Sequence, residues 1–74
     1  MAYRLAIVED EAIVAHSIEK KLSRLGYEVG GVFYRGEDLL SFLETNDVDL
    51  ILMDIHLQEG MSGIEVARQV LERF

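Results

Sequence analysis

Leu5-Ala6-Ile7-Val8-Glu9-Asp10 and Leu50-Ile51-Leu52-Met53-Asp54 are the two stretches of sequence that decide the fold of this chain. Each is a short, continuous apolar run that ends in one or two carboxylates. Such runs are typical of strands that are covered on both faces of a parallel sheet. Ligand sites in these sheets form beyond the carboxyl ends of the strands. If the two strands are parallel neighbours, we expect Glu9, Asp10 and Asp54 to meet at one edge of the sheet.

Three carboxylates grouped in this way predict a site for a divalent cation. Their oxygen atoms are the ligands that hard cations such as Mg²⁺ prefer. Without a cation the like charges repel one another, so at least one acid should be harder to ionise than a free carboxylic acid. We therefore expect Mg²⁺ or Mn²⁺ to bind Glu9, Asp10 and Asp54.

The rest of the sequence alternates between strand and helix patterns. Strands are expected at residues 4–8, 27–33 and 48–53, and helices at residues 11–25, 37–44 and 63–74. The order βαβαβα predicts an α/β fold with a parallel sheet and right-handed crossovers. No linker or internal repeat interrupts the pattern, so residues 1–74 are expected to form one domain.

Apolar stripes and end signals support the first and last of these helices. Val14, Ile18, Leu22 and Leu25 form one stripe of the first helix, and Ile64, Ala67, Leu71 and Phe74 form one stripe of the last. Asp10 is expected to cap the first helix, and Gly26 to end it. The pair Gly30-Gly31 lies inside the second strand and suggests a bulge or a close backbone approach there.

The composition excludes several classes of protein. The net charge of −7 argues against a nucleic-acid-binding surface, and the lack of cysteine excludes disulfides and thiolate chemistry. The first residues do not read as a signal peptide, and no run approaches the length of a membrane span. A soluble cytoplasmic protein without membrane contact is expected.

Four stretches together resemble the receiver domain of two-component response regulators. They are Ile7-Val8-Glu9-Asp10-Glu11, Gly36-Glu37-Asp38-Leu39-Leu40, Asp49-Leu50-Ile51-Leu52-Met53-Asp54-Ile55 and Gly63-Ile64-Glu65-Val66. The resemblance covers essentially the whole chain. It implies a flavodoxin-like, doubly wound parallel sheet with strand order 2-1-3, and a signalling module rather than an enzyme.

The same resemblance implies a role for each acidic residue. Asp54 would accept a phosphoryl group from a sensor histidine kinase or a phosphotransfer protein. Asp10 would bind Mg²⁺ directly, and Glu9 would assist. The backbone carbonyl of His56, two residues after the phosphoacceptor, would complete the protein's share of the metal shell.

Two departures from the family pattern stand out. Gln58 occupies the position four residues after the phosphoacceptor, where the family usually has proline, and the following loop is one residue longer. A receiver also continues with a fourth and a fifth strand, which carry a Ser or Thr and a Lys that contact the phosphoryl group. We therefore expect a partial, truncated receiver that is poorly phosphorylated in this form.

Stopping after the third helix would leave the strand at residues 48–53 on an edge of the sheet. An apolar, unpaired edge is a template for another chain. We expect either a homodimer through this edge or a longer native chain that covers it.

Two alternatives remain open at this stage. Toprim-like nucleotidyl transferases also place a Glu after an early strand and a pair of aspartates after a later one, although His56 would replace the second aspartate here. A receiver-like module that regulates by contact, without phosphorylation, is the other alternative.

Overall fold

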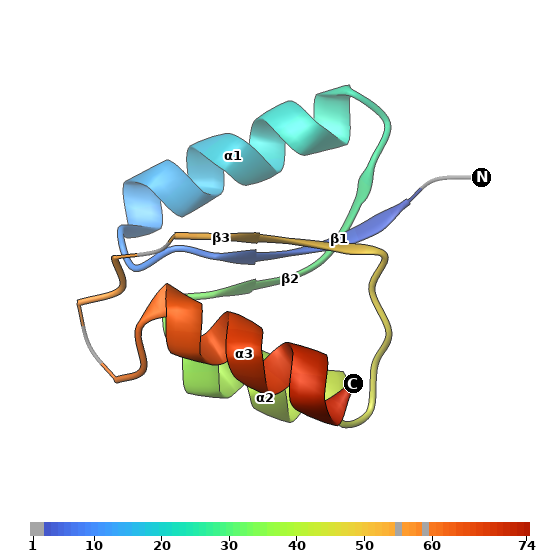
Figure 1. The fold of residues 1–74 in the computed structure, drawn as a ribbon. Helices are drawn as coiled ribbons and strands as arrows, with labels where there is room; N and C mark the ends of the chain where they lie inside the picture. Colours follow the sequence, from blue (N-terminus) through green and yellow to red (C-terminus); the bar gives the residue numbers. More distant parts are fainter. Residues whose placement is uncertain (1–2, 55, 59) are drawn as a thin grey trace.

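The computed structural model describes residues 3–54, 56–58 and 60–74. Its elements are β1 (Arg4–Val8), α1 (Ala12–Arg24), β2 (Glu28–Phe33), α2 (Gly36–Leu43), β3 (Leu50–Met53) and α3 (Gly63–Arg73). The three strands form one parallel sheet in the order β2-β1-β3. Helix α1 covers one face of the sheet, and α2 and α3 cover the other (Figure 1). The predicted α/β class, element order and strand order 2-1-3 are confirmed.

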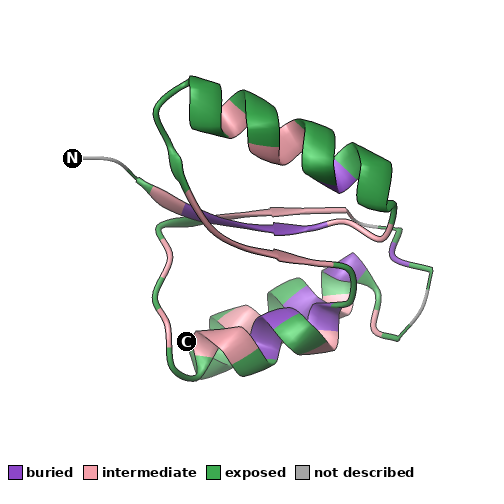
Figure 2. Cartoon of the chain, turned by 180° about the vertical axis from the view of Figure 1, so that it is seen from behind, coloured by how far each residue is buried: buried purple, intermediate pink, exposed green. Residues whose placement is uncertain are grey.

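Strand β1 is the buried centre of the molecule. It pairs with β2 on one side and β3 on the other, and all four residues from Leu5 to Val8 are buried (Figure 2). Alternate side chains of a strand point to opposite faces. Ala6 and Val8 accordingly join the core under α2 and α3, together with Leu39, Leu40, Leu57 and Val66. A continuous apolar run is what a strand needs when helices cover both of its faces.

The glycine pair in β2 produces the expected irregularity. Leu5 pairs with Val29, but Ala6 pairs with Gly31, so the register shifts at Gly30. A Cβ atom on Gly30 would lie 2.7 Å from Nε of Arg4, so the Arg4 side chain would have to move to admit a larger residue. Of the two predicted alternatives, the bulge is therefore confirmed, whereas the atoms that approach Gly30 belong to a side chain and not to a backbone.

The start of β3 is set by a side chain rather than by the ladder. The Asp49 carboxylate accepts a hydrogen bond of 2.7 Å from the Arg4 N–H, and the Asp49 N–H donates to the Arg4 carbonyl at 2.7 Å. The strand begins at Leu50, two residues later than expected, because the carboxylate takes the Arg4 N–H.

The predicted cap of α1 is wrong. Its N-cap is Glu11, which makes no side-chain capping bond. The Asp10 carboxylate instead accepts a hydrogen bond from the Gln58 N–H. A long-range partner therefore replaces the local one. The predicted end of the helix is confirmed, because Gly26 adopts a φ of +95°.

One predicted apolar stripe is partly covered, and the other is not covered. On α1, Ile18 and Leu22 are half-buried and Leu25 is 73% exposed. On α3, the predicted stripe is wrong: its residues Ile64, Ala67, Leu71 and Phe74 are all exposed, and the helix packs on the core through Val66 and Val70 instead. Ile64 and Leu71 line a hollow with residues of β3, and Leu22 of α1 lines another with β3 on the opposite face. Among the described residues, β3 has a neighbouring strand on one side only. The prediction that this strand forms a sheet edge with exposed apolar surface is confirmed.

No helix in the described part of the chain is long and apolar enough to cross a membrane.

Candidate functional site

The acidic residues that follow β1 and β3 converge at the carboxyl end of the sheet. One carboxylate oxygen each from Glu9, Asp10 and Asp54 lies within 4.8 Å of the others. All three residues are partly buried. The sequence predicted this grouping, and the structure brings together every acid that was named.

The register of the sheet produces this convergence. Val8 pairs with Met53, so the two strands end at the same level. The pairing continues one step further, since the Asp54 N–H donates to the Val8 carbonyl at 3.0 Å. On the other side, the Glu9 N–H donates to the Phe33 carbonyl at 2.9 Å. Hydrogen bonds of the sheet thus fix the backbone of both acidic segments independently of their side-chain contacts.

Each carboxylate accepts one backbone N–H. Glu9 accepts from Glu11 at 3.2 Å, Asp54 accepts from His56 at 3.0 Å, and Asp10 accepts from Gln58 at 3.0 Å. No ion pair among the residues that the structure describes involves Glu9, Asp10 or Asp54. Because a carboxylate has about four acceptor positions, each group retains oxygen lone pairs for a further ligand.

The electrostatics of the cluster are visible at Glu9. Burial is the main cause that raises the pKa of this carboxyl group above its ordinary value. The hydrogen bond from Glu11 opposes the shift, and the negative charge of Asp54 and the neighbouring Asp10 add to it. The expectation that one acid would be harder to ionise is confirmed, although burial contributes more than charge repulsion.

His56 is placed beside the site by its backbone. Its N–H donates to Oδ1 of Asp54, whereas the residue as a whole is exposed. The role of its carbonyl oxygen as a metal ligand remains a prediction.

Glu37 is a site residue that the sequence analysis did not single out. One of its carboxylate oxygens accepts the Met61 N–H at 3.4 Å, and the other accepts from Arg35 at 3.3 Å. Hydrogen bonds from its own N–H and from Met61 lower the pKa of Glu37. Gly60 has a φ of +73°, and a Cβ atom on it would collide with this carboxylate. Glu37 thus fixes the loop that precedes α3. The only sequence signal was an acid in the first turn of an expected helix.

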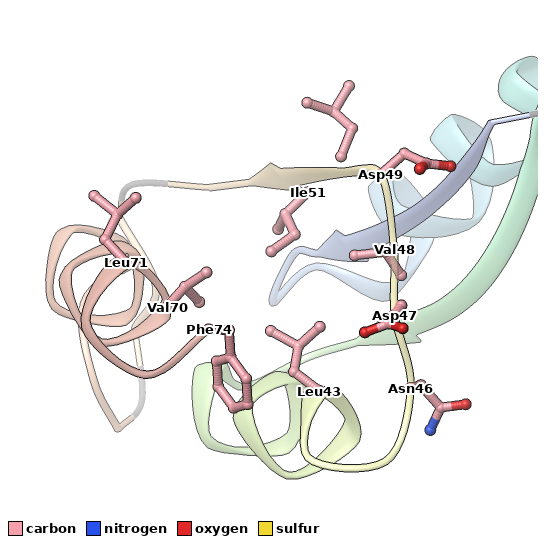
Figure 3. A pocket seen from close by; sticks show the side chains of 10 residues that line it. Leu43, Asn46, Asp47, Val48, Asp49, Ile51, Val70, Leu71 and Phe74 are labelled. Atoms are coloured by element: carbon pink, nitrogen blue, oxygen red, sulfur yellow. The ribbon is translucent and has the colours of Figure 1, made fainter.

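Two hollows differ in their relation to this cluster. A hollow of about 280 Å³ lies directly beside it and is lined by Asp10, Tyr34, Arg35 and Gln58. A larger hollow of about 480 Å³ lies between the start of β3 and the ends of α2 and α3 (Figure 3). Its lining includes Leu43, Ile51 and Phe74, but no residue of the acidic cluster. The chemistry of the site therefore belongs to the carboxyl edge of the sheet.

Comparison with known proteins agrees with this geometry. The family model described as the response regulator receiver domain matches residues 5–74. The response regulator PhyR from Brucella abortus is 36% identical, with a TM-score of 0.88, over 97% of this chain and 30% of that chain. The signal receiver domain of a modulated diguanylate cyclase from Desulfovibrio desulfuricans G20 is 32% identical, with a TM-score of 0.91, over 99% of this chain and 58% of that chain.

A third solved structure extends the comparison. The N-terminal domain of a response regulator/sensory box/GGDEF three-domain protein from Carboxydothermus hydrogenoformans is 36% identical. Its TM-score is 0.89, and the match covers 93% of this chain and 55% of that chain. This chain therefore spans between 30% and 58% of the length of these three structures. The match to residues 5–74, the sheet order and the 32–36% identity to these structures lead to one conclusion: the chain belongs to the response regulator receiver domain family, whose members are signalling modules of two-component systems.

Proposed function

We propose that Asp54 accepts a phosphoryl group from a phosphohistidine on a sensor histidine kinase or phosphotransfer protein. Mg²⁺ or Mn²⁺ would be held by Glu9, Asp10 and Asp54, with the backbone carbonyl of His56. The observation that carries this proposal is the approach of the three carboxylates to within 4.8 Å at the end of two parallel strands. The family to which the chain belongs supports it.

The donor set of the cluster fits a hard divalent cation. All three side chains supply oxygen, which Mg²⁺ and Mn²⁺ prefer over nitrogen or sulfur. Burial, and then the negative charge of Asp54 and the neighbouring Asp10, raise the pKa of Glu9, and a bound cation would favour the charged form of this carboxyl group. When bound, a divalent ion offsets the repulsion between the nucleophilic carboxylate and the phosphoryl oxygens.

The protein's own part in the reaction is to supply and orient the nucleophile. A carboxylate oxygen of Asp54 forms a P–O bond while the P–N bond to the donor's imidazole breaks. The electron pair of that bond stays on the imidazole nitrogen, and the product is an acyl phosphate. The His56 N–H holds Oδ1 of Asp54, which restricts rotation of the carboxylate and helps to position it.

Incubation with acetyl phosphate and Mg²⁺, followed by intact mass analysis, tests the proposal. In this form we expect only a small, short-lived fraction of the chain to gain the mass of one phosphoryl group, and hydroxylamine should remove it, as expected for an acyl phosphate. Asp54→Asn should abolish the increase, and chelation of the metal should suppress it. Asp47→Asn is a matched control, because Asp47 is an exposed aspartate in the loop before β3. Labelling of the Asp54→Asn protein would contradict the assignment of the phosphoacceptor.

The metal site is testable without phosphorylation. In an NMR titration with Mg²⁺, the amide signals of Glu9, Asp10 and Asp54 should move, whereas those of the exposed α3 residue Glu72 should not. Signals at the cluster that stay still in the folded protein at millimolar metal would show that the site is assigned wrongly.

Regulation by contact is a second candidate function. The exposed apolar residues of α3, Ile64 and Leu71, supply a surface for it. PhyR from Bartonella quintana, which is 30% identical over 97% of this chain, has been solved in complex with the anti-sigma factor NepR. A folded chain that binds Mg²⁺ but takes no phosphoryl group from acetyl phosphate would favour contact regulation over phosphotransfer.

A further inference from the structure

We propose that the backbone N–H of Gln58 and the divalent cation each weaken the other's interaction with the carboxylate of Asp10. The loop after the phosphoacceptor would then respond to metal binding. This inference rests on the proposed metal site. Its starting observation is the hydrogen bond of 3.0 Å from the Gln58 N–H to Oδ2 of Asp10, across 48 residues of sequence.

The bond depends on a residue at which this chain departs from its family. Receiver domains usually carry proline where this chain has Gln58. Proline has no N–H, so it could not make this bond. Because Gln58 is exposed, its side chain is not needed for packing, and its structural contribution here comes from its backbone.

The surroundings of Gln58 confine the response to a short segment. Leu57, directly before it, is buried in the core under α2 and α3. On the far side, the Glu37 carboxylate accepts the Met61 N–H, and Arg35 pairs with Glu37 at 3.3 Å. The effect of releasing the Gln58 N–H is therefore expected at Gln58 and not at Leu57 or Met61.

Charge determines the direction of the coupling. In the metal-free protein, the Gln58 N–H places the positive end of a dipole against Asp10, which also faces the negative charges of Glu9 and Asp54. A cation bound to the same carboxylate stabilises its negative charge more strongly than the N–H does. It also draws electron density from the oxygen atoms, so they accept a hydrogen bond less well. Without the N–H, the negative charge of the metal-free cluster would be less stabilised. The affinity of the cluster for the cation would therefore be higher.

The test compares the Mg²⁺ affinity of Gln58→Pro with that of Gln58→Ala. The alanine variant changes the side chain but keeps the N–H. A hydrogen bond to a charged group contributes about 1.5 kcal/mol at the low end, so Gln58→Pro should bind Mg²⁺ about tenfold more tightly. Gln58→Ala should bind as the unsubstituted chain does. Equal affinities in all three proteins, or weaker binding by Gln58→Pro, would overturn this coupling.

Amide hydrogen exchange in the unsubstituted chain gives an independent test, which holds even if Gln58→Pro fails to fold. Saturating Mg²⁺ should reduce the protection of the Gln58 amide and leave the Met61 amide unchanged. Unchanged or increased protection at Gln58 would overturn the proposal. If the unsubstituted chain does not bind Mg²⁺ at all, the proposed metal site is wrong as well. This outcome differs from one in which Mg²⁺ binds but the protection of the Gln58 amide does not fall, which would contradict this inference alone.

Discussion

Neutralising Asp54 should stabilise the metal-free protein while removing its proposed function. The carboxylates of Glu9, Asp10 and Asp54 approach within 4.8 Å, and no ion pair among the described residues compensates them. Asp54→Asn removes one charge and keeps the side-chain shape. It also keeps an Oδ1 atom that can accept the His56 N–H.

The size of the effect follows from the separation of the charges. Two unit charges at about 5 Å repel by roughly 0.8 kcal/mol in bulk water, and by several-fold more where protein excludes solvent. Asp54→Asn removes two such pairs, so unfolding should cost about 2 kcal/mol more. A change of this size corresponds to a rise in Tm of roughly 10 °C for a domain of this length.

Urea and thermal unfolding in the presence of a chelator would measure this change. Asp47→Asn is the control, since it also removes one negative charge but lies outside the cluster. A stabilisation of the same size in both variants would mean that net charge, and not the cluster, is responsible. A loss of stability in Asp54→Asn would refute the reasoning altogether.

Adding Mg²⁺ should reverse the order of stability. A ligand that binds only the folded state, at about a hundredfold over its Kd, stabilises by about 2.7 kcal/mol. The unsubstituted chain should gain this amount, and Asp54→Asn should gain less because it has lost an oxygen ligand with full charge. Equal gains in the two proteins would exclude Asp54 from the metal site.

Three further perturbations follow from the same structure. Burial and then the charge of Asp54 raise the pKa of Glu9 above 4.5, so the folded state binds more protons at Glu9 than the unfolded state does. The stability of the protein should therefore fall as the pH rises from about 4.5 through the folded pKa. Glu9→Gln should flatten this decline in urea unfolding, and an unaltered pH profile would contradict the reasoning. Gly36→Ala would push a methyl group into the buried Val66 side chain and should cost about 1–3 kcal/mol in urea unfolding, with partial recovery on adding Val66→Ala; additive losses would count against this contact. If the chain forms a homodimer through the β3 edge, Leu71→Lys, at a site 85% exposed beside that edge, should shift sedimentation toward monomer, and an unchanged distribution would exclude this surface.

Local sequence patterns were sufficient to predict the class of fold and the acidic residues that follow its strands. Continuous apolar runs identified β1 and β3, and the alternation of strand and helix patterns predicted a parallel sheet with helices on both faces. The resemblance supplied the strand order. Once the order is known, the acids after β1 and β3 must lie at the same edge, because neighbouring parallel strands end on the same side.

Other features depend on contacts between residues that are distant in sequence. Asp10 was expected to cap the helix that follows it, because the N–H groups of the first turn of that helix are the nearest unsatisfied donors. It instead bonds to the Gln58 N–H, 48 residues away, because the two loops meet above the sheet. Glu37 also bonds to a backbone N–H that is distant in sequence, since its partner Met61 lies 24 residues further along the chain. Local propensity cannot predict such a choice, as several donors are chemically equivalent until the fold selects one.

The sequence by itself therefore determined the class of fold, the three carboxylates and their common edge, since these follow from hydrophobic patterning and from the direction of parallel strands. Only the tertiary structure decided which backbone donor each carboxylate takes and which apolar stripe remains uncovered. Hydrogen bonds form only within about 3 Å with suitable angles, and burial depends on which element lies opposite. The packing of α2, α3 and the loops around β1 sets these distances, and no single segment of the sequence contains them.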